Sequence, residues 1–113
     1  MSILIVDDDE GIRETMADIL KEKNFDVQTA RDGFEALKIL KSESFNIILM
    51  DLRMPGMDGI ETSKRIMEIK PDSKIFIISA YISQKVYDDA KVVGIQEIFS
   101  KPVNFTQLVK ILA

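Results

Sequence analysis

Three short runs of apolar residues constrain the fold more than any other feature of this sequence. They occupy residues 3–6, 47–50 and 75–78, and no polar residue interrupts any of them. Strands that are covered on both faces have this continuous apolar character, whereas strands with one solvent face alternate apolar and polar residues. The three runs therefore predict the central strands of a parallel sheet that is buried on both sides.

Two further segments, residues 25–29 and 97–99, are shorter or more polar, as strands nearer a sheet edge usually are. Apolar residues recur at helical spacing between these five segments and again after the last one. Three pairs have the spacing of a capping box at a helix start: Asp32 with Glu35, Asp58 with Glu61, and Asn104 with Gln107. Strand and helix are thus predicted to alternate five times.

This alternation predicts an α/β fold, a doubly wound five-stranded parallel sheet with helices on both faces. The chain has 113 residues, the length of one ordinary domain, and we expect residues 1–113 to form a single domain. Ligands of such sheets bind at the carboxyl ends of the strands. The residues that follow the strands are therefore the first candidates for a functional site.

The composition excludes several classes of function. With 19 acidic and 15 basic residues, the net charge of −4 disfavours direct binding to nucleic acid. Cysteine is absent, which removes disulfides and thiolate chemistry, and no apolar stretch approaches the roughly 18 residues of a membrane span. We therefore expect a cytoplasmic protein that does not enter a membrane. Because histidine is absent too, any chemistry must use carboxylates, hydroxyls and amines.

Carboxylates gather at the predicted carboxyl edge of the sheet. Asp7 and Asp8 follow the first apolar run, and Asp51 follows the second. Two unit charges about 4 Å apart repel by about 4 kcal/mol at an effective dielectric near 20, so such a cluster needs a cation or raised pKa values. Oxygen ligands without histidine or cysteine favour Mg²⁺, with Mn²⁺ as the alternative metal.

A hydroxyl and an ammonium are predicted to join these acids, because Ser79 ends the third apolar run and Lys101 follows residues 97–99. A metal, an ammonium and a hydroxyl together can neutralise and orient a transferring phosphoryl group. Asp51 is then the nucleophilic carboxylate. The remaining polar residues near helix starts, Asp9, Asp32, Asp58 and Asn104, are interpreted as helix caps.

These residues resemble the receiver domain of response regulators. The motifs that carry the resemblance are Val6-Asp7-Asp8, the segment 50–59 (Met-Asp-Leu-Arg-Met-Pro-Gly-Met-Asp-Gly), Ile78-Ser79-Ala80 and Ser100-Lys101-Pro102, and the match spans essentially the whole chain. The resemblance implies a flavodoxin-like sheet in the order 2-1-3-4-5. It also implies that residues 1–113 are a receiver domain with no effector domain in this chain.

The resemblance assigns a role to each site residue. Asp51 is the phosphoacceptor, and Ser79 and Lys101 contact the phosphoryl oxygens. Asp8, Asp51 and the backbone carbonyl of Arg53 ligate the metal, and Asp7 acts mainly through water. The implied reaction is a phosphorelay step of a two-component system, in which the donor is a phosphohistidine on a histidine kinase or histidine phosphotransfer protein. A downstream protein target or effector domain reads the change.

The sequence departs from the family at Ile98, three residues before Lys101, where an aromatic residue often couples to the switch hydroxyl. An aliphatic side chain at this position cannot act as that aromatic switch. We also predict that Arg53 and Tyr81, each two residues beyond a site residue, shield the acyl phosphate from water.

Three other functions are compatible with an α/β fold of this size. An FMN carrier of the flavodoxin type would not place three acids where a phosphate binds. A phosphatase of the haloacid dehalogenase type usually has a second aspartate two positions after its nucleophile, where this chain has Arg53. The strongest alternative is a receiver-like interaction module that works without phosphorylation, which the loss of an acid, the hydroxyl or the lysine would favour. The sequence retains all of them.

Overall fold

Five parallel strands form one sheet in the computed structural model, which describes residues 1–112. The strands are β1 (Ser2–Val6), β2 (Asp26–Ala30), β3 (Ile47–Asp51), β4 (Lys74–Ser79) and β5 (Glu97–Ser100). Their order across the sheet is β2-β1-β3-β4-β5. This confirms the predicted fold class, and each strand starts and ends within two residues of the segment expected from the sequence.

A helix follows each strand: α1 (Glu10–Glu22), α2 (Gly33–Leu40), α3 (Gly59–Ile69), α4 (Gln84–Val93) and α5 (Phe105–Leu112). The side chains of Asp9, Asp32 and Asp58 each accept the backbone N–H of the third residue of the following helix, and Asn104 does the same for α5. These residues are thus caps, as predicted.

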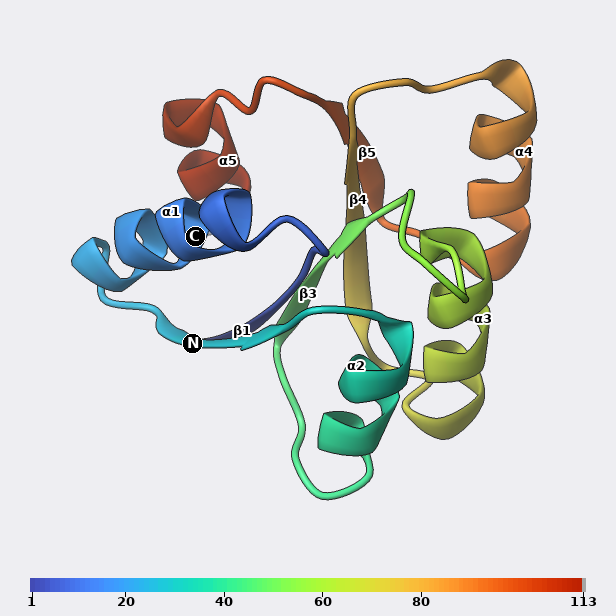
Figure 1. The fold of residues 1–113 in the computed structure, drawn as a ribbon, viewed down its shortest axis with the longest axis horizontal. Helices are drawn as coiled ribbons and strands as arrows, with labels where there is room; N and C mark the ends of the chain where they lie inside the picture. Colours follow the sequence, from blue (N-terminus) through green and yellow to red (C-terminus); the bar gives the residue numbers. More distant parts are fainter. Residues whose placement is uncertain (113) are drawn as a thin grey trace.

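The sheet is covered on both faces (Figure 1). Helices α1 and α5 lie on one face, and α2, α3 and α4 lie on the other. On the first face Ile3 and Ile5 of β1 pack in a cluster with Met16 and Leu108. On the other face Leu4 and Val6 pack in a second cluster that includes Ile66 of α3. Successive residues of β1 therefore enter opposite cores, which is why this strand tolerates no polar residue.

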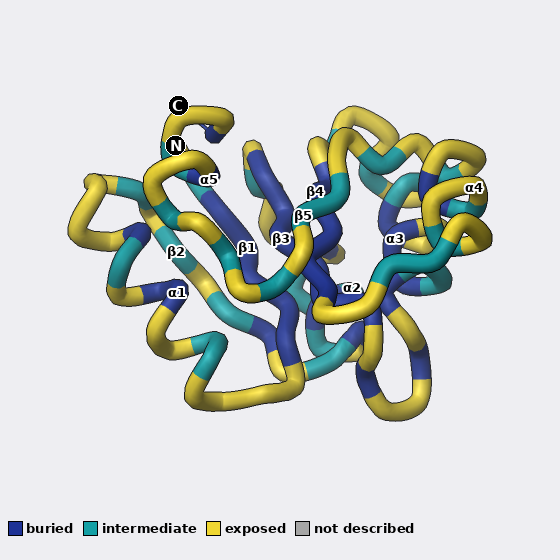
Figure 2. The backbone as a smooth tube through the Cα atoms, turned by 90° about the horizontal axis from the view of Figure 1, so that it is seen from above, coloured by how far each residue is buried: buried dark blue, intermediate teal, exposed yellow. Residues whose placement is uncertain are grey.

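Burial falls from the middle of the sheet toward its edges (Figure 2). Every residue of β3 is buried, whereas β2 alternates between exposed and partly buried residues until Ala30. This difference explains why the central strands were the clearest in the sequence. Within residues 1–112, no helix is long and apolar enough to cross a membrane.

One buried hydroxyl lacks a hydrogen-bond partner. Ser63 of α3 is fully buried, and its Oγ has no partner among the described residues 1–112. An unsatisfied buried polar group costs about 1–3 kcal/mol. Ser63→Ala is therefore expected to raise the free energy of unfolding by about 1 kcal/mol, measured by urea denaturation. The neighbouring Thr62 hydroxyl donates to the Asp58 carbonyl, so Thr62→Val should lower it. A Ser63→Ala variant less stable than the parent would contradict this account.

Candidate functional site

Four strands bring polar side chains to one edge of the sheet. Asp7 directly follows β1, Asp51 is the last residue of β3, Ser79 is the last residue of β4, and Lys101 directly follows β5. The backbone N–H of Lys101 donates to the Ser79 carbonyl at 2.8 Å, which joins the ends of the last two strands. Parallel strands present their carboxyl ends together, so four positions far apart in the sequence meet in space.

The start of α3 packs tightly against Asp51. A Cβ atom on Gly59 would overlap the backbone carbonyl oxygen of Asp51, and the Gly59 N–H donates to the Leu52 carbonyl at 2.7 Å. Only glycine allows this close approach of helix and strand. The backbone of Asp51 is thereby held between β3 and the first turn of α3.

Lys101 bridges two of the carboxylates. Its Nζ lies 3.4 Å from Asp7 Oδ2 and 3.4 Å from Asp51 Oδ1, and all three side chains are mostly buried. Asp7 Oδ1 also accepts the backbone N–H of Asp9 at 2.9 Å. The guanidinium of Arg13 donates to the Asp7 carbonyl at 2.7 Å. Arg13, which sequence reasoning did not single out, thus ties the first turns of α1 to the site.

The electrostatics of the site disfavour a negative charge on Asp51. Burial and the neighbouring carboxylate of Asp7 raise the pKa of Asp51 from 3.8 to about 6, although Lys101 opposes the shift. Burial lowers the pKa of Lys101, but Asp7 and Asp51 outweigh it and raise that pKa above its ordinary value. The ammonium is therefore charged at neutral pH, and it offsets only part of the negative charge around it.

The donor set fits a hard divalent cation. Asp7, Asp8 and Asp51 each offer a carboxylate oxygen, and these three oxygens lie within 4.8 Å of one another. Asp7 and Asp51 are buried, whereas Asp8 is exposed. Three carboxylates against one ammonium leave a net charge that a divalent cation would neutralise, and oxygen donors are the ligands Mg²⁺ prefers. Burial contributes most to the raised pKa of Asp51, and the neighbouring Asp7 carboxylate adds to it.

The hydroxyl of Ser79 is engaged with its own loop. Ser79 Oγ donates to the Tyr81 carbonyl at 3.1 Å and accepts the Tyr81 N–H at 3.4 Å. The Tyr81 ring in turn lies under the guanidinium of Arg53, 5.5 Å from guanidinium carbon to ring centroid. The two residues predicted to shield the site are therefore in contact with each other.

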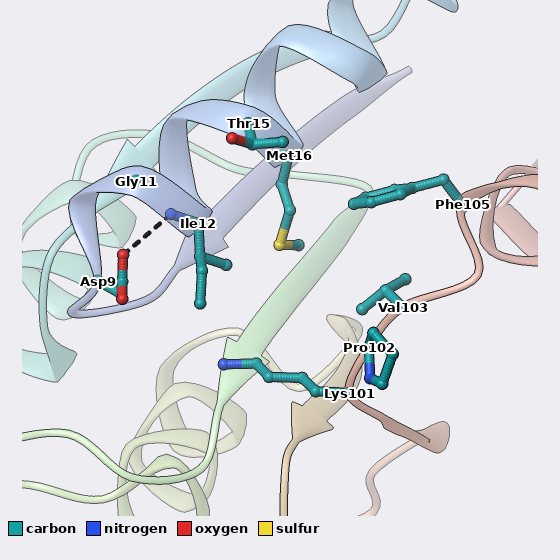
Figure 3. Close-up of a pocket in the computed structure, with 9 residues that line it drawn as sticks. All are labelled: Asp9, Gly11, Ile12, Thr15, Met16, Lys101, Pro102, Val103 and Phe105. Atoms are coloured by element: carbon teal, nitrogen blue, oxygen red, sulfur yellow. Dashed lines mark hydrogen bonds between the residues drawn. The ribbon is translucent and has the colours of Figure 1, made fainter.

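An apolar groove of about 720 Å³ borders the site (Figure 3). It lies between α1 and the segment that joins β5 to α5, and its apolar lining includes Ile12, Met16, Val103 and Phe105. Lys101 lies at one end of this groove, where its side chain extends toward the end of β3. The sequence did not reveal this groove, because the spacing of apolar residues on a helix and in a loop does not show an open surface between them.

Known proteins share the whole of this architecture. The family model "Response regulator receiver domain" matches residues 3–113. Sporulation initiation phosphotransferase F of Bacillus subtilis is 33% identical over 106 residues, which cover 94% of this chain and 86% of that protein. The solved structure of a CheY-like receiver domain protein from Methanospirillum hungatei superposes with a TM-score of 0.95 at 30% identity, over 98% of this chain and 89% of that one. The solved structure of the response regulator TrrA from Thermotoga maritima in complex with Mg²⁺ and BeF superposes with a TM-score of 0.87 at 33% identity. The match covers 98% of this chain and 95% of that one.

Proposed function

Because this chain belongs to the response regulator receiver domain family, we propose that it is a signalling switch that accepts a phosphoryl group on Asp51. The observation that carries the proposal is the position of this carboxylate: buried at the carboxyl edge of the sheet, 3.4 Å from the Lys101 ammonium and clustered with Asp7 and Asp8. Domains of this family are signalling domains and not classical enzymes. Here the chain would catalyse its own phosphorylation and a slow autodephosphorylation, without turnover of an external substrate.

The reaction would begin with attack of an Asp51 carboxylate oxygen on phosphorus. The new oxygen–phosphorus bond forms as the bond to the leaving group breaks, and the leaving group departs with the electron pair. Lys101 would offset the charge on the phosphoryl oxygens, and the Ser79 hydroxyl would donate a hydrogen bond to one of them. At neutral pH most Asp51 carboxyls are ionised, since their pKa is about 6, so the nucleophile is available.

The residues proposed to hold Mg²⁺ are Asp8, Asp51 and the backbone carbonyl of Arg53, with Asp7 acting mainly through water and Mn²⁺ as the alternative metal. When bound, the cation supplies positive charge that lowers the repulsion between the carboxylates and the incoming phosphoryl group. The exposure of Asp8 leaves this side of the cluster open to water, which suits Mg²⁺ because this ion usually keeps several water ligands.

The donor is proposed to be a phosphohistidine on a histidine kinase or histidine phosphotransfer protein. Residues 1–113 contain no histidine, which is consistent with a donor supplied by a partner. The groove beside α1 suits that partner, since its apolar walls lead to Lys101 and the site (Figure 3). Helix α4 and strand β5 would form the surface that a downstream protein target or effector domain reads. A cytoplasmic location is part of the same proposal.

Intact-mass spectrometry with acetyl phosphate tests the proposed function. With Mg²⁺ the chain should gain one phosphoryl group, and it should gain none in EDTA or as the Asp51→Asn variant. The Asp9→Asn variant, which changes an exposed cap, should label like the parent. Absence of any gain under all conditions would overturn the proposal and favour the receiver-like interaction module that works without phosphorylation.

A further inference from the structure

The hydrogen of the Ser79 hydroxyl already has an acceptor. It is donated to the Tyr81 carbonyl, and Ser79 is almost fully buried at the end of β4. A serine hydroxyl carries a single hydrogen, so it cannot donate to Tyr81 and to a phosphoryl oxygen at the same time. Any contact between Ser79 and a phosphoryl group on Asp51 therefore requires that the bond to Tyr81 be given up first.

Tyr81 is held from its other side by Arg53. The guanidinium lies over the tyrosine ring at 5.5 Å, a distance at which cation–π attraction operates. Arg53 belongs to the loop between β3 and α3, and Tyr81 to the loop between β4 and α4. The two side chains thus connect the loop that follows the phosphoacceptor with the loop that follows the switch hydroxyl. Both also line one groove of about 310 Å³ with Ser83 and Val86 at the start of α4.

At the position where receiver domains often have an aromatic partner for the switch hydroxyl, this chain has the aliphatic residue Ile98. Ile98 is partly buried and packs against the apolar cluster on the α2–α4 face of the sheet. The aromatic ring nearest to Ser79 along the chain is that of Tyr81, a residue that is 62% exposed. Exposure leaves the ring free to change its position when its backbone is released.

We propose that Arg53 and Tyr81 are positioning residues that hold the Ser79 hydroxyl in its unphosphorylated orientation. This inference rests on the proposed function and deepens it. The Arg53–Tyr81 contact stabilises the loop conformation in which the Tyr81 carbonyl takes the Ser79 hydrogen. Binding of a phosphoryl group at Asp51 draws that hydrogen away, which releases Tyr81 from Arg53 and frees the loop that leads into α4. If phosphoryl binding weakens the Arg53–Tyr81 contact, then by linkage the loss of this contact must favour phosphoryl binding by the same free energy.

The affinity for beryllofluoride, a mimic of the phosphoryl group, tests this linkage. At saturating Mg²⁺, Tyr81→Ala should bind beryllofluoride about two- to fivefold more tightly than the parent, the ratio that corresponds to an exposed cation–π contact. Tyr81→Phe keeps the ring and the backbone and should bind like the parent. Arg53→Ala removes a charge from the site as well as the contact with Tyr81. Its effect on beryllofluoride affinity is therefore measured in the parent and in the Tyr81→Ala background. Loss of the contact should increase the affinity only in the parent background. An equal or weaker affinity of Tyr81→Ala would overturn the proposal.

A second measurement needs no phosphoryl chemistry. The chain has two tyrosines and no tryptophan, so Tyr87→Phe leaves Tyr81 as the only strong emitter above 300 nm. In this background and without ligand, Ser79→Ala should increase acrylamide quenching of Tyr81, because the bonds that hold its backbone are gone. Ser79→Thr should restore the original quenching. Unchanged quenching in Ser79→Ala would overturn the positioning role, whereas failure of the proposed function would appear only as the missing mass gain.

Discussion

Replacing Lys101 with alanine is expected to slow phosphoryl transfer to Asp51 about a hundredfold. The Lys101 ammonium lies 3.4 Å from both Asp51 Oδ1 and Asp7 Oδ2, and it is mostly shielded from water. Removing one donor that stabilises developing charge in such a site typically costs about 10²–10³ in rate. The initial rate of mass gain with acetyl phosphate and saturating Mg²⁺ measures the effect.

One control variant and one control measurement make this result specific. Lys110→Ala removes an exposed lysine of α5 and should label at the rate of the parent. Circular dichroism at saturating Mg²⁺ should show that Lys101→Ala keeps its fold, since the metal then offsets the carboxylates that have lost their ammonium. A rate within threefold of the parent would mean that Lys101 does not neutralise the transferring group.

Asp51→Asn is expected to stabilise the metal-free protein at neutral pH by about 2–3 kcal/mol, since a shift of one pKa unit corresponds to about 1.4 kcal/mol. Burial and the charge of Asp7 raise the pKa of Asp51 in the folded state to about 6, above the unfolded value of 3.8. The folded state therefore binds this proton more tightly than the unfolded state does. The cost of ionising Asp51 is fully present above pH 6, shrinks as the pH falls toward 4, and is absent once both states are protonated. An uncharged asparagine never incurs it.

Urea denaturation of both proteins in EDTA from pH 4 to 8 checks this prediction. The difference in the free energy of unfolding should grow with pH through the interval from 4 to 6 and then level off. Asp18 is an exposed residue of α1, and Asp18→Asn serves as the control. Its difference from the parent in the free energy of unfolding should not grow with pH in this way. Mg²⁺ should reduce the difference, because the parent gains stability from binding the cation. A difference that is independent of pH would contradict the burial and repulsion assigned to Asp51.

The strands could be predicted because each central run had to be apolar at every position. Leu4 and Ile5 enter different cores on opposite faces of the sheet, so neither position tolerates a polar residue. The first polar residue after such a run then marks the end of the strand, which is how Asp7 and Asp51 were found. Strand β2 was harder to delimit, because only one of its faces is well covered and its residues alternate.

The sequence by itself determined the alternation of strands and helices, the caps and the residues that share the carboxyl edge of the sheet, since these follow from local periodicity and from the parallel arrangement. Only the tertiary structure decided which atoms meet there. The stacking of Arg53 on Tyr81 and the groove beside α1 depend on segments that follow different strands, and the acceptor of the Ser79 hydrogen depends on how the loop after β4 folds back on itself. The raised pKa of Asp51 likewise depends on burial and on the distance to Asp7, quantities that exist only in the folded chain.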